Sequence, residues 1–376
     1  MATREPPLTL GIEEEYLLVD HETRAVASEP PAQLFADLHE RTAGRAFPEF
    51  LRAQVEIATP VCRSIGDARV ELGSLRRAVI EETAKYGLAP IAASSHPFSL
   101  SSKQKRTDKE RYVALLEEMQ GAARRMMICG LHVHVGFEDD EMRIDLLNQL
   151  TYFLPHLLAL SCSSPFWEGE RTGLMSFRLM IFNGVPRTGL PQHFSSWGEY
   201  RRHTDVLVET GIIADNSRIW WDLRPSARYP TLETRVMDCC TTLEDALSLA
   251  ALNQCLVRTL WRLRRANQRW RMYSHLLLGE NRWRAMRYSF DAGLLDLGQQ
   301  RVVPFRELLE EMLELVAEDA AALGCSAEVA RIPEILARGT SAHRQLQVHE
   351  QALAAGATPE EALRAVVDWL VAETAR

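Results

Sequence analysis

Short segments bounded by Gly, Pro, Asp or Ser alternate along the chain with longer segments whose apolar residues recur at three- and four-residue spacing. The short segments predict strands, and the longer ones predict helices. The strands are expected within residues 8–18, 49–58, 88–93, 131–137, 218–223 and 231–237. The helices are expected near residues 66–86, 108–123, 141–160, 196–210 and 242–270.

After about residue 300 the pattern predicts helix only. Thr358, Pro359 and Glu361 form a strong helix start, with an N-cap, a proline in the first turn and a capping box. We therefore expect a helical layer over residues 242–376, with Trp369 in the core. No repeat or low-complexity linker divides the chain, so a single domain over residues 1–376 is predicted, with its core motifs in 8–240.

The first predicted strand carries three consecutive glutamates. Side chains alternate between the faces of a strand, so Glu13 and Glu15 share one face. Glu14 lies on the other face, beside Ile12 and Tyr16. A solvent-facing strand would tolerate such charges, but a bound cation would offset the repulsion between the two carboxylates.

Three further strands carry polar residues among apolar ones. His132 and His134 share a face, and so do Glu233 and Arg235, while Glu56 interrupts an apolar run. Each pair has a structural interpretation as well, either as hydrogen-bonded histidines or as a salt bridge. Four such strands together predict a sheet with one polar face, whose carboxylates and imidazoles suit Mg²⁺ or Mn²⁺.

Composition narrows the function classes. Of 376 residues, 43 are Lys or Arg and 51 are Asp or Glu, which gives a net charge of −8 and argues against a nucleic-acid partner. The seven cysteines form no CxxC pair, which fits neither a disulfide framework nor a zinc ribbon. No apolar signal core or membrane span is present, so a cytoplasmic protein without a membrane partner is expected.

Five motifs resemble, in order and spacing, the bacterial glutamate–cysteine ligase type 2 family, the YbdK-like ATP-dependent carboxylate–amine ligases of the glutamine synthetase superfamily. The motifs are GIEEEYLLVD, QVEIATPV, SSHPF, GLHVHVG and WWDLRPSARYPTLETRVMD. The resemblance implies an α+β fold, in which a curved, largely antiparallel sheet forms a funnel with helices on its convex side. It also implies ATP and two or more Mg²⁺ or Mn²⁺ ions as cofactors.

The activity implied by the resemblance is amide formation through an acyl phosphate. The expected substrates are small molecules: glutamate or a similar carboxylate, and cysteine or another amine, giving γ-glutamylcysteine. Phosphoryl transfer needs positioning and charge neutralisation, which metals and arginines supply. The alternatives are a metal-dependent amide hydrolase that uses the HxH and carboxylate site, and a non-catalytic binding protein. A homo-oligomer is also expected.

The resemblance also implies roles for single residues. Glu13, His132 and Glu233 would hold the metal that bridges the ATP phosphates. Glu15 and Glu56 would hold a second metal near the acceptor carboxylate and the amine. Arg235 and Arg224 would face the phosphoryl group, and Glu56 is a candidate to take the proton of the attacking amine.

Four other residues are weaker candidates. His96 would reach nucleotide or substrate, or else has a structural role in its loop. His134 would contact substrate, act as a further metal ligand or orient its neighbour. Residues 171–191 are expected to form a long cationic loop whose Arg178 and Arg187 receive a substrate carboxylate, or which acts as a lid.

Overall fold

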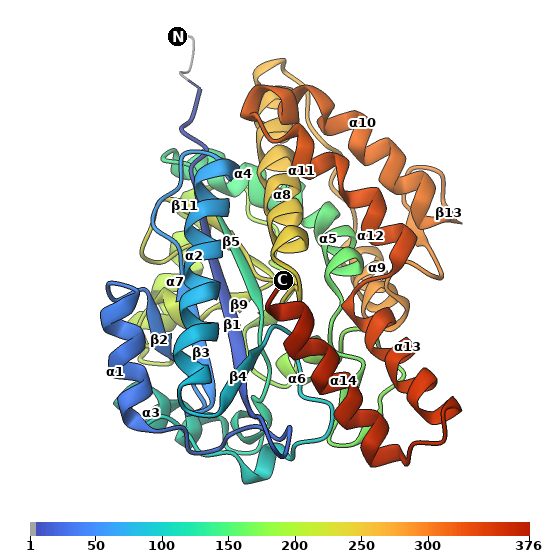
Figure 1. Cartoon of the computed structure of the whole chain (residues 1–376). Helices are drawn as coiled ribbons and strands as arrows, with labels where there is room; N and C mark the ends of the chain where they lie inside the picture. The colour runs from blue at the N-terminus through green and yellow to red at the C-terminus, as the bar shows by residue number, and fades with distance from the viewer. Residues whose placement is uncertain (1–4) are drawn as a thin grey trace.

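Seven antiparallel strands form the central sheet of the protein (Figure 1). The structure is a computed structural model that describes residues 5–376. The strands run in the order β10-β11-β5-β1-β3-β2, and β4 also pairs with β1. Their bounds are β1 (Leu10–Asp20), β2 (Ala46–Pro48), β3 (Gln54–Ala58), β4 (Leu88–Ile91), β5 (Leu131–Gly136), β10 (Leu223–Pro225) and β11 (Thr231–Thr234). Five of the six predicted strands are thus in this sheet, in a largely antiparallel α+β arrangement; the segment predicted at 218–223 instead contains β9 (Trp220–Trp221), which pairs in parallel with β8 (Thr188–Gly189).

One face of this sheet packs against helices α2 (Ile65–Ala84) and α8 (Leu243–Arg265). In Figure 1, α2 crosses in front of β1 and β3, with α8 beside it. Most side chains on this face are apolar and fully buried, among them Ile12, Val133 and Leu232. Burying such side chains is the main favourable term in folding. The opposite face is therefore the one that carries the polar residues.

The C-terminal part is helical, as predicted, and lies on one side of the sheet (Figure 1). Its helices are α9 (His275–Tyr288), α10 (Phe305–Leu323), α11 (Ser326–Ala330), α12 (Ile332–Arg338), α13 (Ser341–Ala354) and α14 (Pro359–Thr374). The predicted capping box of Thr358 and Glu361 starts α14. Trp369 packs against the core, with the Arg344 guanidinium 4.8 Å from its ring centre. The single-domain assignment stays a prediction.

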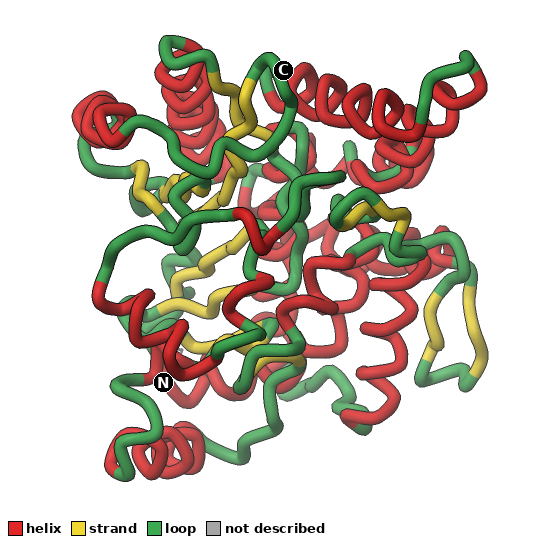
Figure 2. Tube along the Cα trace, turned by 90° about the horizontal axis from the view of Figure 1, so that it is seen from below, coloured by secondary structure: helices red, strands yellow, loops and turns green. Residues whose placement is uncertain are grey.

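The prediction of helix only after residue 300 is wrong at residues 301–303. Strands β12 (Leu294–Asp296) and β13 (Arg301–Val303) form a hairpin there. Asp296 Oδ1 accepts hydrogen bonds from the backbone N–H groups of Gly298 and Gln299, which stabilises the turn. Figure 2 shows this hairpin at the edge of the molecule, apart from the main sheet.

Two other predictions need correction. The helix expected over residues 141–160 is divided into α4 (Asp140–Leu150), η3 (Thr151–Phe153) and α5 (Leu154–Ser161), with Pro155 in the first turn of α5. Proline lacks the N–H that a continuous helix would use there. The loop expected over residues 171–191 contains helix α6 (Phe177–Phe182), whose Leu179 is fully buried. Burial of this apolar side chain anchors the segment to the core, which disfavours the role of a mobile lid.

The remaining elements surround the sheet. They are α1 (Ala32–Arg41), α3 (Glu110–Met119), α7 (Trp197–Glu209), η1 (Ser101–Lys103), η2 (Ala123–Arg125), η4 (Asn216–Arg218), β6 (Phe166–Trp167), β7 (Glu170–Arg171), β8 (Thr188–Gly189) and β9 (Trp220–Trp221). Across residues 5–376, the helices lack the combination of length and apolar composition that crossing a membrane requires. All seven cysteines are buried thiols.

Candidate active site

The register of the sheet brings the polar residues of five strands to one face. Residues directly opposite each other on neighbouring strands project to the same side. The opposed pairs are Glu15 with Glu56, Glu13 with His132, Gly11 with His134, His134 with Glu233, and Glu233 with Arg224. We call this surface the polar face; it comprises Glu13, Glu15, Glu56, His132, His134, Arg224, Glu233 and Arg235. The sequence predicted such a face, and the register shows how its members meet.

Three of these residues form a candidate metal centre. Ligand atoms of Glu13, His134 and Glu233 all lie within 4.8 Å of one another. His134 Nδ1 lies 2.9 Å from the Thr231 hydroxyl, which fixes the orientation of the ring. His134 Nε2 is buried, lacks a hydrogen-bond partner, and lies 3.4 Å from a Glu13 oxygen. A buried imidazole nitrogen that faces two carboxylates suits a divalent cation.

This geometry changes the grouping predicted from the sequence. The sequence placed His132, and not His134, with Glu13 and Glu233. In the structure, His132 Nδ1 lies 3.1 Å from Glu13 Oε2, so His132 contacts Glu13 from the neighbouring position on β5. Because β5 lies between β1 and β11, His132 is paired with Glu13 on β1, and His134 is paired with Glu233 on β11.

Burial and neighbouring charges set the protonation of these groups. Burial opposes ionisation of Glu13, but its contacts with His132 and His134 hold its pKa well below the ordinary value. Burial, together with the positive charge of Arg235, lowers the pKa of His132 to about 4, so this ring is neutral near pH 7. Burial also opposes ionisation of Glu233, yet Arg235 and Arg224 lower its pKa well below the ordinary value.

A second carboxylate group lies farther along the polar face. Burial and the charge of Glu49 raise the pKa of Glu15 to about 7. Burial and the charges of Glu49 and Glu13 raise the pKa of Glu56 well above its ordinary value. Adjacent, partly buried carboxylates favour either a shared proton or a cation. Sequence reasoning did not single out Glu49, which lies before β3; its Oε2 accepts a hydrogen bond from Tyr112 at 2.6 Å.

Two arginines converge on Glu233. The Arg224 guanidinium donates two hydrogen bonds to this carboxylate, at 2.8 and 3.0 Å. Arg235 forms an ion pair with it, and Arg235 Nε is buried without a hydrogen-bond partner. The salt-bridge interpretation of Glu233 and Arg235 is thus confirmed, and Glu233 is at the same time part of the candidate metal centre. The side chains of Arg224 and Arg235 are each only 12% exposed, which strengthens their electrostatic interactions with Glu233.

The structure does not bring His96 or Arg187 to the polar face. His96 is fully buried: its Nδ1 accepts from the backbone N–H of Ser99 at 2.9 Å, and its Nε2 lies 2.9 Å from the Arg24 carbonyl oxygen. Its two ring nitrogens therefore hold a loop in place. Arg187 forms an ion pair with Glu118 at 2.9 Å and lines a separate cavity of about 800 Å³ beside α7.

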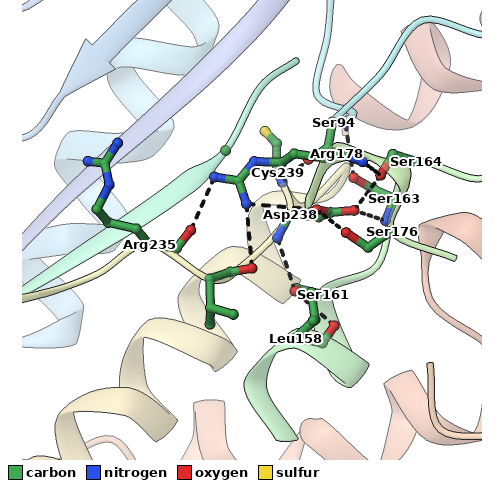
Figure 3. A network of polar contacts seen from close by, with 12 residues as sticks. Ser94, Leu158, Ser161, Ser163, Ser164, Ser176, Arg178, Arg235, Asp238 and Cys239 are labelled. Carbon is green, nitrogen blue, oxygen red and sulfur yellow. Dashed lines mark hydrogen bonds and ion pairs between the residues drawn. The ribbon is translucent and has the colours of Figure 1, made fainter. Parts of the chain in front are cut away.

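Arg178 is the one candidate from residues 171–191 that reaches the polar face. It is 3% exposed and donates hydrogen bonds to the carbonyl oxygens of Arg235 and Val236 (Figure 3). A side chain on Gly130 would collide with its guanidinium, so Arg178 lies directly over this glycine. Gly130 N in turn donates a hydrogen bond of 2.8 Å to Glu15.

Residues 9–368 match the family described as Glutamate-cysteine ligase family 2 (GCS2). The chain belongs to this family. It is 58% identical over 375 residues to a protein of Rhodospirillum rubrum, a match that covers 99% of this chain and 96% of the relative. It is 54% identical over 374 residues to a protein of Paracoccus denitrificans, with coverage of 100% and 99%. Both relatives carry the name "Putative glutamate--cysteine ligase 2".

Two solved structures share the fold. A bifunctional glutathione synthetase from Pasteurella multocida has a TM-score of 0.67 at 17% identity, covering 97% of this chain and 52% of its own. A glutamate–cysteine ligase from Francisella tularensis, in complex with AMP, has a TM-score of 0.67 at 14% identity, covering 98% and 89%. The predicted α+β fold is confirmed. Family membership confirms the predicted ligase class, and nothing supports the hydrolase alternative.

Proposed function

We propose that this protein is an ATP-dependent carboxylate–amine ligase that forms an amide through an acyl phosphate. A carboxylate is a poor acylating agent, so ATP first transfers its terminal phosphoryl group to it, and the amine then displaces phosphate. Glutamate is the proposed acid and cysteine the nominal amine, with γ-glutamylcysteine as product. The observation that carries this proposal is the convergence of Glu13, His134, Glu233, Arg224 and Arg235 on one buried face of a sheet in a member of this family.

The residues of the polar face suit two cation positions. Glu13, Glu233 and His134 would hold one ion, with His132 contacting Glu13 beside them. Glu15 and Glu56 would hold a second. Oxygen-rich sites with an imidazole suit Mg²⁺ and Mn²⁺. Bound there, such ions supply neutralisation of the phosphate charge.

The arginines position the phosphoryl group. Arg235 and Arg224 present guanidinium groups, which match phosphate oxygens in a planar, bidentate geometry. Glu233 holds both of them at one end of the polar face. The transferring group would lie between these cations and the carboxylates of β1, in a buried region where fixed charges act strongly.

The amine must lose a proton as it attacks, and Glu56 is our proposed acceptor. Glu56 lies on β3, opposite Glu15; β1 and β5 lie between β3 and β11, and Arg235 directly follows β11. This separation would place phosphoryl transfer at one end of the polar face and amine attack at the other. A homo-oligomeric state and a cytoplasmic location stay predictions.

The proposal is tested by measuring ADP release with Mg²⁺, ATP, L-glutamate and a panel of amines that includes L-cysteine, with mass spectrometry of the products. A new amide mass that appears together with ADP is the expected result. Glu13→Gln and Glu233→Gln should abolish turnover, whereas Glu310→Gln, at an exposed position of α10, should retain it. Amide cleavage without ATP, and no ADP with any pair, would overturn the ligase assignment.

A further inference from the structure

The strand pairing beside Arg235 contains one extra residue. Thr234 lies opposite Val133, and Asp238 lies opposite Gly130. Between these two pairs, residues 235–237 face only residues 131–132, which is a β-bulge. A regular strand would place Glu233 and Asp238 on opposite faces, since they are five positions apart. The bulge brings both to the same side of the paired strands.

The backbone of the bulge is bound from both sides. The N–H groups of Arg235 and Val236 both donate to the carbonyl oxygen of Asp222, at 2.7 and 3.1 Å. The carbonyl oxygens of the same two residues both accept from the Arg178 guanidinium, at 3.1 and 3.4 Å. The planar guanidinium supplies several donors in a rigid fork, so one side chain binds both carbonyls.

Arg178 is in turn held by a buried carboxylate. Asp238 is fully buried, and its Oδ1 lies 3.9 Å from Arg178 Nη1. The Asp238 carboxylate also accepts hydrogen bonds from the Ser163 backbone N–H at 2.9 Å and from the hydroxyls of Ser164 and Ser176, both at 2.8 Å. Figure 3 shows Arg178 between these serines and the Arg235 carbonyl, with the Arg235 side chain pointing away from the network.

We infer that Arg178 and Asp238 are positioning residues that hold the β-bulge in the shape that directs the Arg235 guanidinium to Glu233 and the phosphoryl group. This inference rests on the proposed function, because it assigns their effect to the phosphoryl-transfer step. Arg235 is the catalytic residue; the other two act through its backbone. Gly130 is part of the same arrangement, because only a residue without a side chain leaves room for Arg178.

A misplaced catalytic group costs on the order of 10²-fold in rate even when the group itself is retained. Asp238→Asn keeps the shape of the side chain but removes the charge that holds Arg178. Arg178→Gln removes the donors to the two bulge carbonyls. Each should lower kcat on the order of 10²-fold while the KM for ATP changes by less than about threefold.

A double-mutant cycle distinguishes positioning from general destabilisation. Both substitutions are made in the wild-type protein and in Arg235→Ala. If Arg178 and Asp238 act through Arg235, each should lower kcat by less than about threefold in the Arg235→Ala protein. Ser176→Ala, which removes one hydrogen bond from Asp238, provides a milder variant that should give a smaller loss of the same kind. Thermal melting checks that every variant is folded.

Arg258→Gln is the matched control. Arg258 forms an ion pair of 2.6 Å with the fully buried Asp319, on helices α8 and α10 outside the polar face. This variant should lose stability without losing kcat.

A second readout does not depend on turnover. In the substrate-free protein labelled with ¹⁵N-arginine, the Arg235 Nε–H resonance is assigned by its loss in Arg235→Ala. It should shift in Asp238→Asn and stay unchanged in Arg258→Gln. An unchanged resonance in Asp238→Asn, or equal losses of kcat with and without Arg235, would overturn the inference. A wild-type protein without turnover would instead reject the proposed ligase, and the resonance would still test the positioning role.

Discussion

Arg76 binds Glu14 through two hydrogen bonds of 2.7 and 2.6 Å, on the face of β1 opposite Glu13 and Glu15. Both partners are buried, and Arg76 also donates to the carbonyl oxygens of Cys240 and Thr241. The three consecutive glutamates therefore have two different roles. Glu14 joins the sheet to α2, whereas its neighbours belong to the polar face.

Breaking this ion pair should be costly. Arg76→Met leaves the Glu14 carboxylate buried without its cation, and we expect the free energy of unfolding to fall by about 3–5 kcal/mol. Urea unfolding measures this change. Arg24→Met is the control, because Arg24 and Asp368 form an exposed pair on the surface; it should cost less than about 1 kcal/mol. Similar losses in both variants would contradict the structural role of Arg76.

The two histidines of β5 should differ in metal binding. His134→Ala removes a nitrogen that faces both Glu13 and Glu233, so we expect Mn²⁺ affinity to fall by more than about tenfold. His132→Ala should weaken binding less, because His132 contacts Glu13 alone among the three grouped residues. Electron paramagnetic resonance of free Mn²⁺ measures both affinities. A larger loss with His132→Ala would restore the grouping predicted from the sequence.

Lysine should not replace Arg235. The substitution keeps the charge but loses the planar fork of donors. We expect kcat for ADP release to fall on the order of 10²-fold or more, with the melting temperature little changed. Arg301→Lys, at an exposed position of the β12–β13 hairpin, should leave kcat unchanged. An Arg235→Lys enzyme with wild-type turnover would remove Arg235 from the catalytic set.

Glu56 should destabilise the protein in the absence of a cation. Burial and the charges of Glu49 and Glu13 disfavour its ionised form. Glu56→Gln should therefore raise the melting temperature in EDTA and reduce the additional stabilisation by Mg²⁺. Thermal melts with and without Mg²⁺ measure both effects, with the exposed Glu310→Gln as control. A lower melting temperature in EDTA would show that the Glu56 carboxylate makes a favourable contact there.

His96 should contribute to acid sensitivity. Burial lowers its pKa from 6.5 to about 4. Between these values the unfolded chain binds a proton that the folded protein does not, so the free energy of unfolding falls as pH falls. The loss from this one group reaches about 3 kcal/mol by pH 4.

His96→Asn keeps one acceptor and one donor but does not titrate in this range. Urea unfolding between pH 7 and pH 4.5 should show a weaker pH dependence for this variant than for the wild-type protein. The control is His193→Asn, at an exposed position. If it weakened the pH dependence of the free energy of unfolding as much as His96→Asn does, burial of His96 would not be the cause.

Much of the polar face was predictable because side-chain direction within a strand follows from local geometry. The period of two placed Glu13 with Glu15, His132 with His134, and Glu233 with Arg235, without knowledge of the partner strands. The helix start at Thr358 was predictable for the same reason, since capping depends on residues three positions apart. The five motifs indicated the family, because their order and spacing are properties of the chain.

The interior of residues 141–191 was predicted less well. Pro155 and the apolar residues of α6 are visible in the sequence, but their effect depends on which surfaces pack against them. His96 shows the same limit. A histidine beside a predicted strand has the same chemistry in a ligand site and in a loop, and only its neighbours show which nitrogens are occupied.

The local geometry of the chain therefore dictated which side chains share a strand face and which ligase family the motifs resemble. The folded arrangement settled that His134 joins Glu13 and Glu233, that Arg76 neutralises Glu14, and that a bulge turns Asp238 toward Arg178. These relationships depend on strand register, an inserted residue and burial. Each is set by contacts between segments far apart in the sequence, where the energy of packing and desolvation outweighs local preference.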